Sequence, residues 1–302
     1  MDKKYFIGIC IGLLIGVSMS TRQAHATVEN EEAMAGNLPQ IIQPVDMSKD
    51  FNFAGEPLPN NFDVRERLER ELSVNAYWQS STLLNIKTAH RYFPMIERVL
   101  AEHGIPQDFK YLAVAESNLR NVSSSANAKG FWQFRKLAAK EMGLEVNDEV
   151  DERYHAEKAT IAACKYIKQL YGRFGSWTNA AASYNVGPTN FKRTLQDQGQ
   201  DSFYDLNMNS ETSRYLFRLV AFKEIMSEPE KYGYYVNEDE KYPPFDYYEV
   251  EVNKSVPKWS KFAEEHGISY RLLKVYNPWL RNNKLTVINN TYMIRIPRRT
   301  SN

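Results

Sequence analysis

The chain has 302 residues, with 38 lysines and arginines against 37 acidic residues and a hydrophobic share of 43%. This length accommodates one sizeable domain and a smaller one, and the composition is that of an ordinary globular protein. The near-neutral charge argues against a polyanionic partner, so we expect no binding to nucleic acid.

The amino terminus has the pattern of a signal peptide. Lys3 and Lys4 precede an apolar run that ends near Val17, and Ala24-His25-Ala26 offers a cleavage site. The run is too short for a comfortable membrane span. We therefore predict a signal peptide over residues 1–26 and an exported mature chain, periplasmic or associated with the cell envelope. We expect this chain to be a monomer with no transmembrane span.

Residues 27–84 are predicted to form an amino-terminal arm followed by a helical extension. Residues 27–60 are polar and interrupted by prolines, as in a linker or an extended arm. A helix is predicted from Asp63 to Leu83. Its charge run is interpreted as a solvated face, made of Arg65, Glu66, Arg67, Glu69, Arg70 and Glu71.

Helical signals dominate residues 85–232, and no sheet is expected between residues 85 and 230. Helices are predicted over 92–103, from 108, over 151–174 and over 177–185, and a further helix, capped by Ser210 or Thr212, is predicted to end near Met226. Ser176 is the expected N-cap of the helix that starts at Trp177. Cys164 is predicted to be a small buried hydrophobe rather than a nucleophile. The expected fold class is mainly α, with a compact helical domain that contains a cleft.

Glu116 is the candidate chemical group of this domain. At the helical period it shares one face with Phe109, Leu112 and Ala113, all of which are apolar. Burial and the negative end of a helix both raise the pKa of a carboxyl group. A carboxylic acid that is still protonated near neutral pH can protonate a glycosidic oxygen. The alternatives are a solvated glutamate or one that pairs with an arginine.

The composition changes after Glu230. Residues 233–246, with Tyr242-Pro243-Pro244, are predicted to be a linker. Residues 247–299 are predicted to form a β-α-α-β module, with strands near 248–252 and 291–296 and helices near 259–266 and 270–276.

Four motifs in order carry a resemblance to a known family. They are Glu116-Ser117, Gly130-Phe131-Trp132-Gln133, Ala182-Ser183-Tyr184-Asn185-Val186-Gly187 and Glu211-Thr212 followed by Tyr215. The chain resembles the soluble lytic transglycosylase domain, of the membrane-bound lytic murein transglycosylase D type. The resemblance implies a lysozyme-like helical fold. The carboxy-terminal module resembles a LysM repeat, although the turn at 253–256 departs from the usual pattern and leaves sugar binding open.

The resemblance implies cleavage of the β-1,4 bond between N-acetylmuramic acid and N-acetylglucosamine in peptidoglycan glycan strands. Water is not used, and the product carries a 1,6-anhydro end. Glu116 would be the single acid and base, a role that needs no second carboxylate. A lysozyme-like hydrolase of the same bond and a catalytically silent wall-binding protein are the alternatives.

Further site residues also follow from the resemblance. Substrate-binding roles are expected for Ser117, Gln133, Tyr184, Asn185 and Tyr215. Glu211 and Trp132 are expected to support the site. From the residues alone, Ser117 could equally cap a helix end, Tyr184 could be a core tyrosine, and Phe131 and Trp132 could fill the core. No metal site and no cofactor are expected, because the five histidines are scattered and no phosphate-binding loop is visible.

Overall fold

A computed structural model describes residues 43–298 of the chain. The predicted signal peptide, residues 1–26, lies outside the described residues, as do residues 27–42 of the predicted arm. Of the described residues, 45–298 belong to one compact unit. Within the described residues, no helix combines the length and the apolar character that crossing a bilayer requires.

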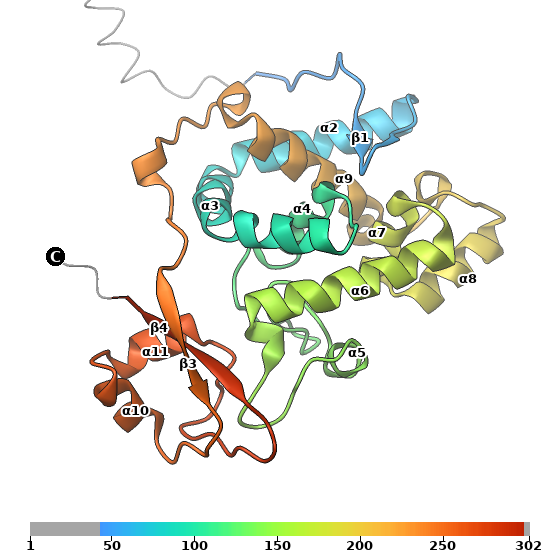
Figure 1. The fold of residues 1–302 in the computed structure, drawn as a ribbon. Helices are drawn as coiled ribbons and strands as arrows, with labels where there is room; N and C mark the ends of the chain where they lie inside the picture. Colours follow the sequence, from blue (N-terminus) through green and yellow to red (C-terminus); the bar gives the residue numbers. More distant parts are fainter. Residues whose placement is uncertain (1–42, 299–302) are drawn as a thin grey trace, which may run out of the picture. The chain divides into compact units, whose positions relative to one another are not determined.

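The larger part of this unit is helical, as the sequence predicts (Figure 1). A short hairpin of β1 (Asn52–Phe53) and β2 (Glu56–Pro57) precedes the helices. The helices are α2 (Phe62–Tyr77), α3 (Gln79–Glu102), α4 (Lys110–Ser117), α5 (Lys136–Glu141), α6 (Ala156–Phe174), α7 (Trp177–Val186), α8 (Pro188–Gln198) and α9 (Ser210–Ser227).

Side-chain caps decide where several helices begin. The Ser176 hydroxyl accepts the Asn179 amide and caps α7, as predicted. Asn209, rather than Ser210 or Thr212, caps α9 by accepting the Thr212 amide. The helix predicted from residue 151 begins at Ala156 instead, because His155 is its N-cap and a 3₁₀ turn, Glu152–Tyr154, precedes it.

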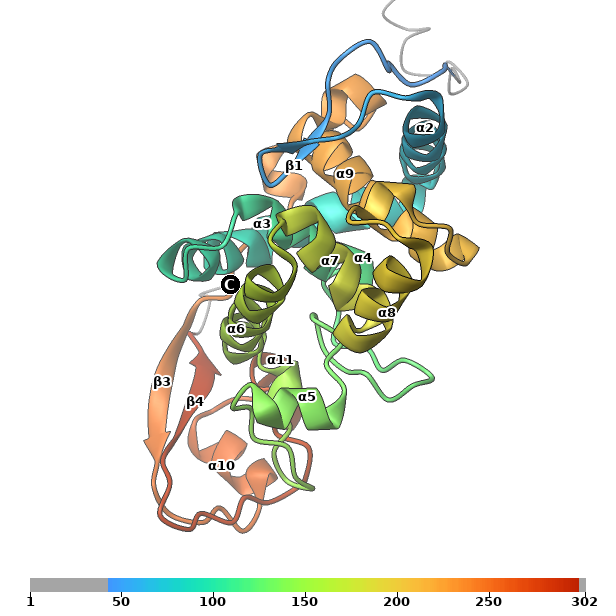
Figure 2. The same ribbon diagram turned by 90° about the vertical axis from the view of Figure 1, so that its right-hand side faces the viewer.

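The hydrophobic core of the helical part surrounds α4 and α9. Leu112, Ala113 and Val114 of α4 are fully buried, and so are Leu219 and Val220 of α9. Helix α9 packs against α2, α4 and α7. Figure 2 shows α9 and α7 beside α4 in the interior of the helical part. Residues from distant parts of the sequence therefore meet at the end of α4.

One predicted solvated residue is buried. Glu71 of α2 has no exposed surface, and its carboxylate pairs with Arg214 and Arg218 of α9. The prediction for the charge run 65–71 is therefore wrong at this position. Glu71 follows Leu68 by three residues, so it lies on the buried face of α2, where the two arginines neutralise it.

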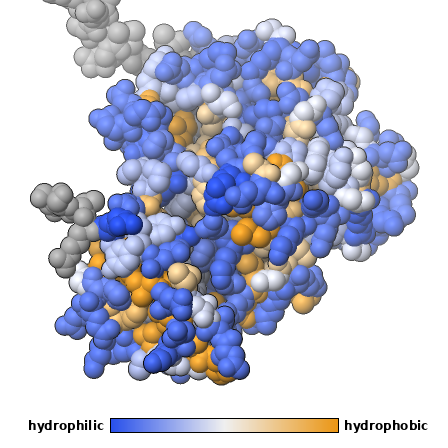
Figure 3. All heavy atoms as spheres, viewed as in Figure 1, coloured by the Kyte–Doolittle hydropathy of each residue, from blue (hydrophilic) through white to orange (hydrophobic). Residues whose placement is uncertain are grey.

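The carboxy-terminal part has the predicted β-α-α-β order. It comprises β3 (Tyr247–Val252), α10 (Trp259–Glu265), α11 (Tyr270–Tyr276) and β4 (Tyr292–Pro297). The two strands pair antiparallel, with Tyr247 opposite Pro297 and Val252 opposite Tyr292. This module has a core of its own, which includes Trp259, Leu273 and Ile294. Hydrophobic residues also reach its surface, as Figure 3 shows at the lower left.

Candidate active site

Glu116 lies at the carboxy-terminal end of α4, one residue before the helix ends. Asn118 ends the helix in the left-handed conformation, with a φ of 51°, and its amide donates to the Val114 carbonyl. Phe109, Leu112 and Ala113 are each fully buried, so the predicted apolar face is confirmed. Glu116 itself is partly exposed, and protein atoms surround its carboxyl group.

Burial raises the pKa of Glu116 to about 7. The hydrogen bond from Tyr215 and the nearby Arg218 oppose this increase, whereas the negative charge of Glu211 adds to it. The carboxyl group is therefore poised to exist in both protonation states near neutral pH, which suits a group that first gives a proton and then accepts one.

Tyr215 is the direct partner of the carboxyl group. It lies on α9, and its hydroxyl donates to Glu116 Oε1 at 2.7 Å. Tyr215 is buried, and its phenol pKa is raised well above the ordinary value by burial and by the Glu116 charge. The tyrosine therefore stays protonated and acts as a fixed hydrogen-bond donor.

The structure does not pair Glu116 with an arginine. Arg218 is the cation that affects its pKa, but Arg218 Nε lies 3.4 Å from Glu71 Oε2. Arg214 also bonds to Glu71. Sequence reasoning missed this group of three charges. The spacing of Arg214 and Arg218, four residues apart on one helix face, was the available signal.

The Gly130–Phe134 loop lies beside the end of α4. The backbone of Gln133 is left-handed, with a φ of 47°, and its side-chain Nε2 donates to the Gly130 carbonyl at 2.7 Å. This bond holds the Gln133 side chain against its own loop. No hydrogen bond to the Gln133 amide oxygen forms among the described residues.

Ser117 joins α4 to this loop. Its hydroxyl lies within 3.0 Å of the Ala113 carbonyl and 2.9 Å of the Phe131 carbonyl, and the side chain is buried. The hydroxyl is therefore engaged with the backbone and does not face open space. We assign it to positioning the loop instead of direct contact with a substrate.

The aromatic residues of the loop fill the core. Phe131 and Trp132 are 2% and 0% exposed, and Trp132 Nε1 donates to the Thr160 hydroxyl at 3.0 Å. Phe131 packs edge-on against Tyr92. Of the two alternatives for these side chains, core packing is the one that the structure supports, and neither is available to stack on a sugar.

Tyr184 on α7 holds the loop from the other side. Its hydroxyl donates to the Trp132 carbonyl at 2.7 Å. Burial raises the pKa of this phenol well above its ordinary value, and the Glu116 charge adds to the increase. Tyr215, and not Tyr184, makes the hydrogen bond that orients the carboxyl group. Asn185 is half-buried and makes no side-chain hydrogen bond within residues 43–298.

Glu211 lies in the first turn of α9 and is exposed. It influences the carboxyl group through charge alone. No cluster of three or more metal-ligating side chains exists among the residues that the structure describes. The site is thus one carboxyl group, two phenols and a glutamine loop, drawn from α4, α7, α9 and the loop 130–134.

Comparisons with known proteins define the class of domain that has this site. Residues 94–207 match the family described as the transglycosylase SLT domain. Residues 248–300 match the soluble lytic transglycosylase C-terminal LysM-like domain. The chain therefore contains an SLT domain followed by a LysM-like domain, and both resemblances noted in the sequence are confirmed.

The chain is similar in sequence to two proteins named membrane-bound lytic murein transglycosylase D, from Escherichia coli K12 and from Escherichia coli O6:H1 strain CFT073. Each is 25% identical over 235 residues, which cover 76% of this chain and 50% of the relative. The chain thus spans about half the length of the curated relatives it matches.

A solved structure of an inactive mutant of the lytic transglycosylase Slt from Pseudomonas aeruginosa also matches. It has 16% identity and a TM-score of 0.37, and the match covers 60% of this chain and 35% of that one.

Proposed function

We propose that this protein is a lytic transglycosylase of peptidoglycan. The observation that carries the proposal is the Glu116 carboxyl group, whose pKa burial raises to about 7 at the end of a buried helix. The SLT domain and the names of the curated relatives support the same assignment. The substrate would be the glycan strand, cleaved at the β-1,4 bond between N-acetylmuramic acid and N-acetylglucosamine.

The proposed reaction has two proton transfers at one carboxyl group. Protonated Glu116 gives its proton to the glycosidic oxygen as the bond from that oxygen to the muramoyl anomeric carbon breaks. The resulting carboxylate takes the proton of the muramoyl C6 hydroxyl, whose oxygen bonds to the anomeric carbon. The products are a free N-acetylglucosamine end and a 1,6-anhydro end, and Glu116 regains its proton.

The other residues take supporting roles in this scheme. The Tyr215 hydroxyl stabilises the carboxylate between the two transfers, because it donates to the charged oxygen. Gln133 and Asn185 offer amide groups to the sugar, and Tyr184 and Ser117 hold the loop that presents Gln133. Trp132 supports the loop from the core. Glu211 keeps the carboxyl pKa high by charge repulsion.

Replacement of Glu116 tests the assignment. Glu116→Gln keeps the size of the side chain but cannot exchange a proton, so release of anhydro-ended fragments from purified peptidoglycan should fall to background. Glu69→Gln, an exposed change on α2, is the matched control and should keep parental activity. Equal release by Glu116→Gln and the parent would contradict the proposal.

Mass spectrometry of the products distinguishes the proposed transglycosylase reaction from hydrolysis of the same bond. A hydrolase would leave a reducing muramic acid, which is heavier than the anhydro end by one water. A silent wall-binding protein would sediment with insoluble peptidoglycan and release nothing. We expect anhydro ends.

We propose export through a signal peptide over residues 1–26, a monomeric chain, a catalytic domain over 85–232 and a linker over 233–246. The name of the curated relatives, membrane-bound transglycosylases, supports a place in the cell envelope. Protease protection in spheroplasts, before and after lysis, tests this location.

A further inference from the structure

The LysM-like module is joined to the helical part by backbone hydrogen bonds. The Asp151 amide donates to the Trp279 carbonyl at 2.9 Å, and the Arg281 amide donates to the Glu149 carbonyl at 2.8 Å. Between them, Val150 and Leu280 form an antiparallel bridge. Such a ladder fixes the register of two segments, as in the addition of a strand to a sheet edge.

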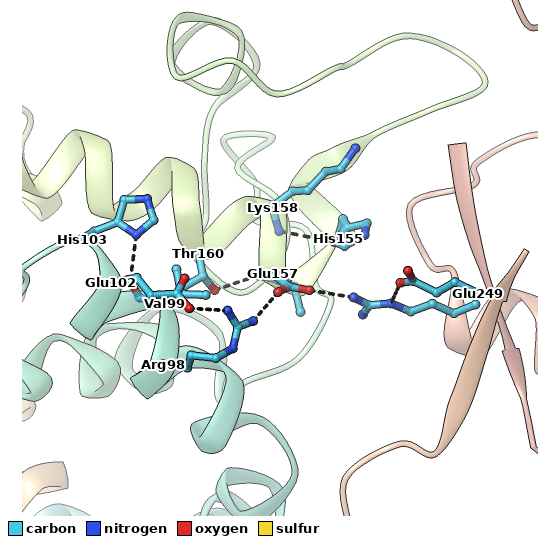
Figure 4. Close-up of polar contacts among 11 residues, drawn as sticks. Arg98, Val99, Glu102, His103, His155, Glu157, Lys158, Thr160 and Glu249 are labelled. Carbon is cyan, nitrogen blue, oxygen red and sulfur yellow. Dashed lines mark hydrogen bonds and ion pairs between the residues drawn. The ribbon is translucent and has the colours of Figure 1, made fainter. Parts of the chain in front are cut away.

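Side chains extend the contact on both sides of this ladder. The Glu149 carboxylate accepts the Thr286 amide and lies 3.4 Å from Lys284 Nζ. At the other side, Glu157 of α6 pairs with Arg98 of α3 and, at 2.8 Å, with Arg295 of β4. Figure 4 shows Glu157 in the middle of this row of charges.

Hydrophobic residues of the helical part are buried in the core of the module at this contact. Val150 and Tyr154 are 1% and 5% exposed, and both pack into the module's core, not into the core around α4 and α9. These two residues, which precede the module's opening strand by 97 and 93 residues, thus complete the module's core. A module that was only tethered would leave these side chains in water.

A buried ion pair leads from this contact toward the active-site loop. Asp151, whose amide bonds to the module, receives two bonds from Arg153, at 2.8 Å from Nε and 2.7 Å from the second terminal nitrogen. The two side chains are 5% and 4% exposed. The remaining terminal nitrogen of Arg153 donates to the Asn127 and Phe134 carbonyls, at 3.2 Å each.

The backbone of Arg153 is equally close to the loop. A Cβ on Gly130 would lie 1.8 Å from the Arg153 carbonyl oxygen, so the loop lies directly on this residue. Asn127 and Phe134 flank Gly130 and Gln133 on both sides. Arg153 therefore binds both ends of the segment 127–134, which contains Gln133.

We propose that the LysM-like module is a structural support of the active site, and that Arg153 is the positioning residue through which its docking orders the Gln133 loop. Docking fixes Asp151, Asp151 fixes the Arg153 guanidinium, and the guanidinium fixes both ends of the loop. The part of the proposal that concerns catalysis rests on the proposed function. The ordering of the loop is independent of any activity.

Hydrogen exchange of the full chain without substrate tests the ordering. Val150→Asp places a charge in the contact without removing a side chain from the helical core, and Ile288→Asp, at a residue 77% exposed on the module, is the control. We expect the Lys129 and Gly130 amides, which donate to Phe134 and Val122, to exchange at least about tenfold faster in Val150→Asp.

The control should exchange at the parental rate, as should the α9 amides in all variants. Unchanged exchange at Lys129 and Gly130 in a variant whose module contact is lost would overturn the proposal. Loss of the contact is read from faster exchange of the Arg281 amide. If the α9 amides also exchange faster in Val150→Asp, that variant has unfolded as a whole. Exchange of the Lys129 and Gly130 amides in Arg153→Lys then decides the question.

Kinetics on soluble glycan fragments test Arg153 itself. Arg153→Met loses all the guanidinium bonds, and Arg153→Lys keeps the charge but not the planar fork. We expect KM to rise at least about fivefold in Arg153→Met and less in Arg153→Lys, because a loosened Gln133 binds sugar poorly. A smaller folded fraction would lower apparent kcat but leave KM unchanged, and a change in kcat alone would contradict the positioning role.

The two proposals fail in different ways. If Glu116→Gln keeps full activity, the catalytic assignment fails, while the exchange rates still decide whether the module orders the loop. If Glu116→Gln is inactive and the exchange rates are unchanged, the catalytic assignment stands and the support role fails.

Discussion

At the scale of single residues, the site depends on what surrounds one carboxyl group. Glu116 is held in a setting that favours its neutral form, while Tyr215 donates to the charged form. These opposed effects leave the pKa near neutrality instead of at an extreme. The balance predicts how activity and stability respond to pH.

The Tyr215→Phe variant should shift the pH profile upward. Removal of the hydroxyl removes a bond that lowers the pKa of Glu116, so the carboxyl group stays protonated to higher pH. In the parent, the loss of kcat/KM at alkaline pH should have a midpoint at about 7. The variant should have a higher midpoint and a lower maximum, measured from release of anhydro ends between pH 5 and pH 9. A downward shift would contradict the assignment.

The Glu116→Gln variant should be more stable than the parent at pH 8. The folded pKa of about 7 lies above the ordinary 4.5, so the folded state binds the proton more tightly, and the parent loses stability as pH rises from 4.5 through 7. The full difference amounts to about 3 kcal/mol. Urea unfolding at pH 8 and at pH 4 measures it, with little gain expected at pH 4. Equal gains at both values would show that the carboxyl charge is not the cause.

At the scale of elements, three side chains hold the loop 130–134 by hydrogen bonds to its backbone carbonyls. Ser117 bonds to the Phe131 carbonyl, Tyr184 to the Trp132 carbonyl and Arg153 to the Phe134 carbonyl. The loop needs Gly130 because its φ of 78° is costly for other residues and because the Arg153 carbonyl leaves no room for a side chain. A small change at this glycine should therefore have a large effect.

Gly130→Ala should destabilise the protein by more than about 3 kcal/mol, since neither the backbone angle nor the neighbouring carbonyl can accommodate the added methyl group. Gly172→Ala is the matched control. Gly172 lies inside α6, without a left-handed φ and with open space around it, and alanine there should stabilise by about 0.5–1 kcal/mol. Urea unfolding measures both. Similar values for the two variants would contradict the steric argument.

At the scale of the whole described unit, the module is bonded to the helical part at several points. The segment predicted as a linker also contacts α3, where the Tyr242 amide donates to the Lys87 carbonyl and Arg91 bonds to the Pro243 carbonyl. Neither the module nor the segment before it is free of the helical part. The two parts should therefore unfold together.

Calorimetry should record one unfolding transition for the parent, because the module's core includes Val150 and Tyr154 from the helical part. In Val150→Asp the coupling weakens, and the single transition should separate into two, with the module unfolding first. The Ile288→Asp control should keep one transition. Two separate transitions in the parent would show that the contact contributes little to stability.

The sequence by itself determined which side chains are chemically notable and on which face of their helix they lie. The spacing of Phe109, Leu112 and Ala113 placed Glu116 on a buried face near a helix end, and the order of four motifs indicated the SLT domain. Hydrophobic periodicity predicts the helix face on which a side chain lies, because that face depends only on residues close by in the chain.

Only the tertiary structure decided which partners those side chains have. Tyr215 lies 99 residues after Glu116, and their hydrogen bond exists because α9 packs against α4. The burial of Glu71 and the contact of the module with residues 149–151 likewise depend on the packing of elements that are far apart in the chain. A helical period predicts on which face of a helix a side chain lies, but not which residues of other elements pack against that face. The hydrogen bond of Tyr215 to Glu116 and the bonds of Arg153 to the loop could therefore be found only in the folded chain.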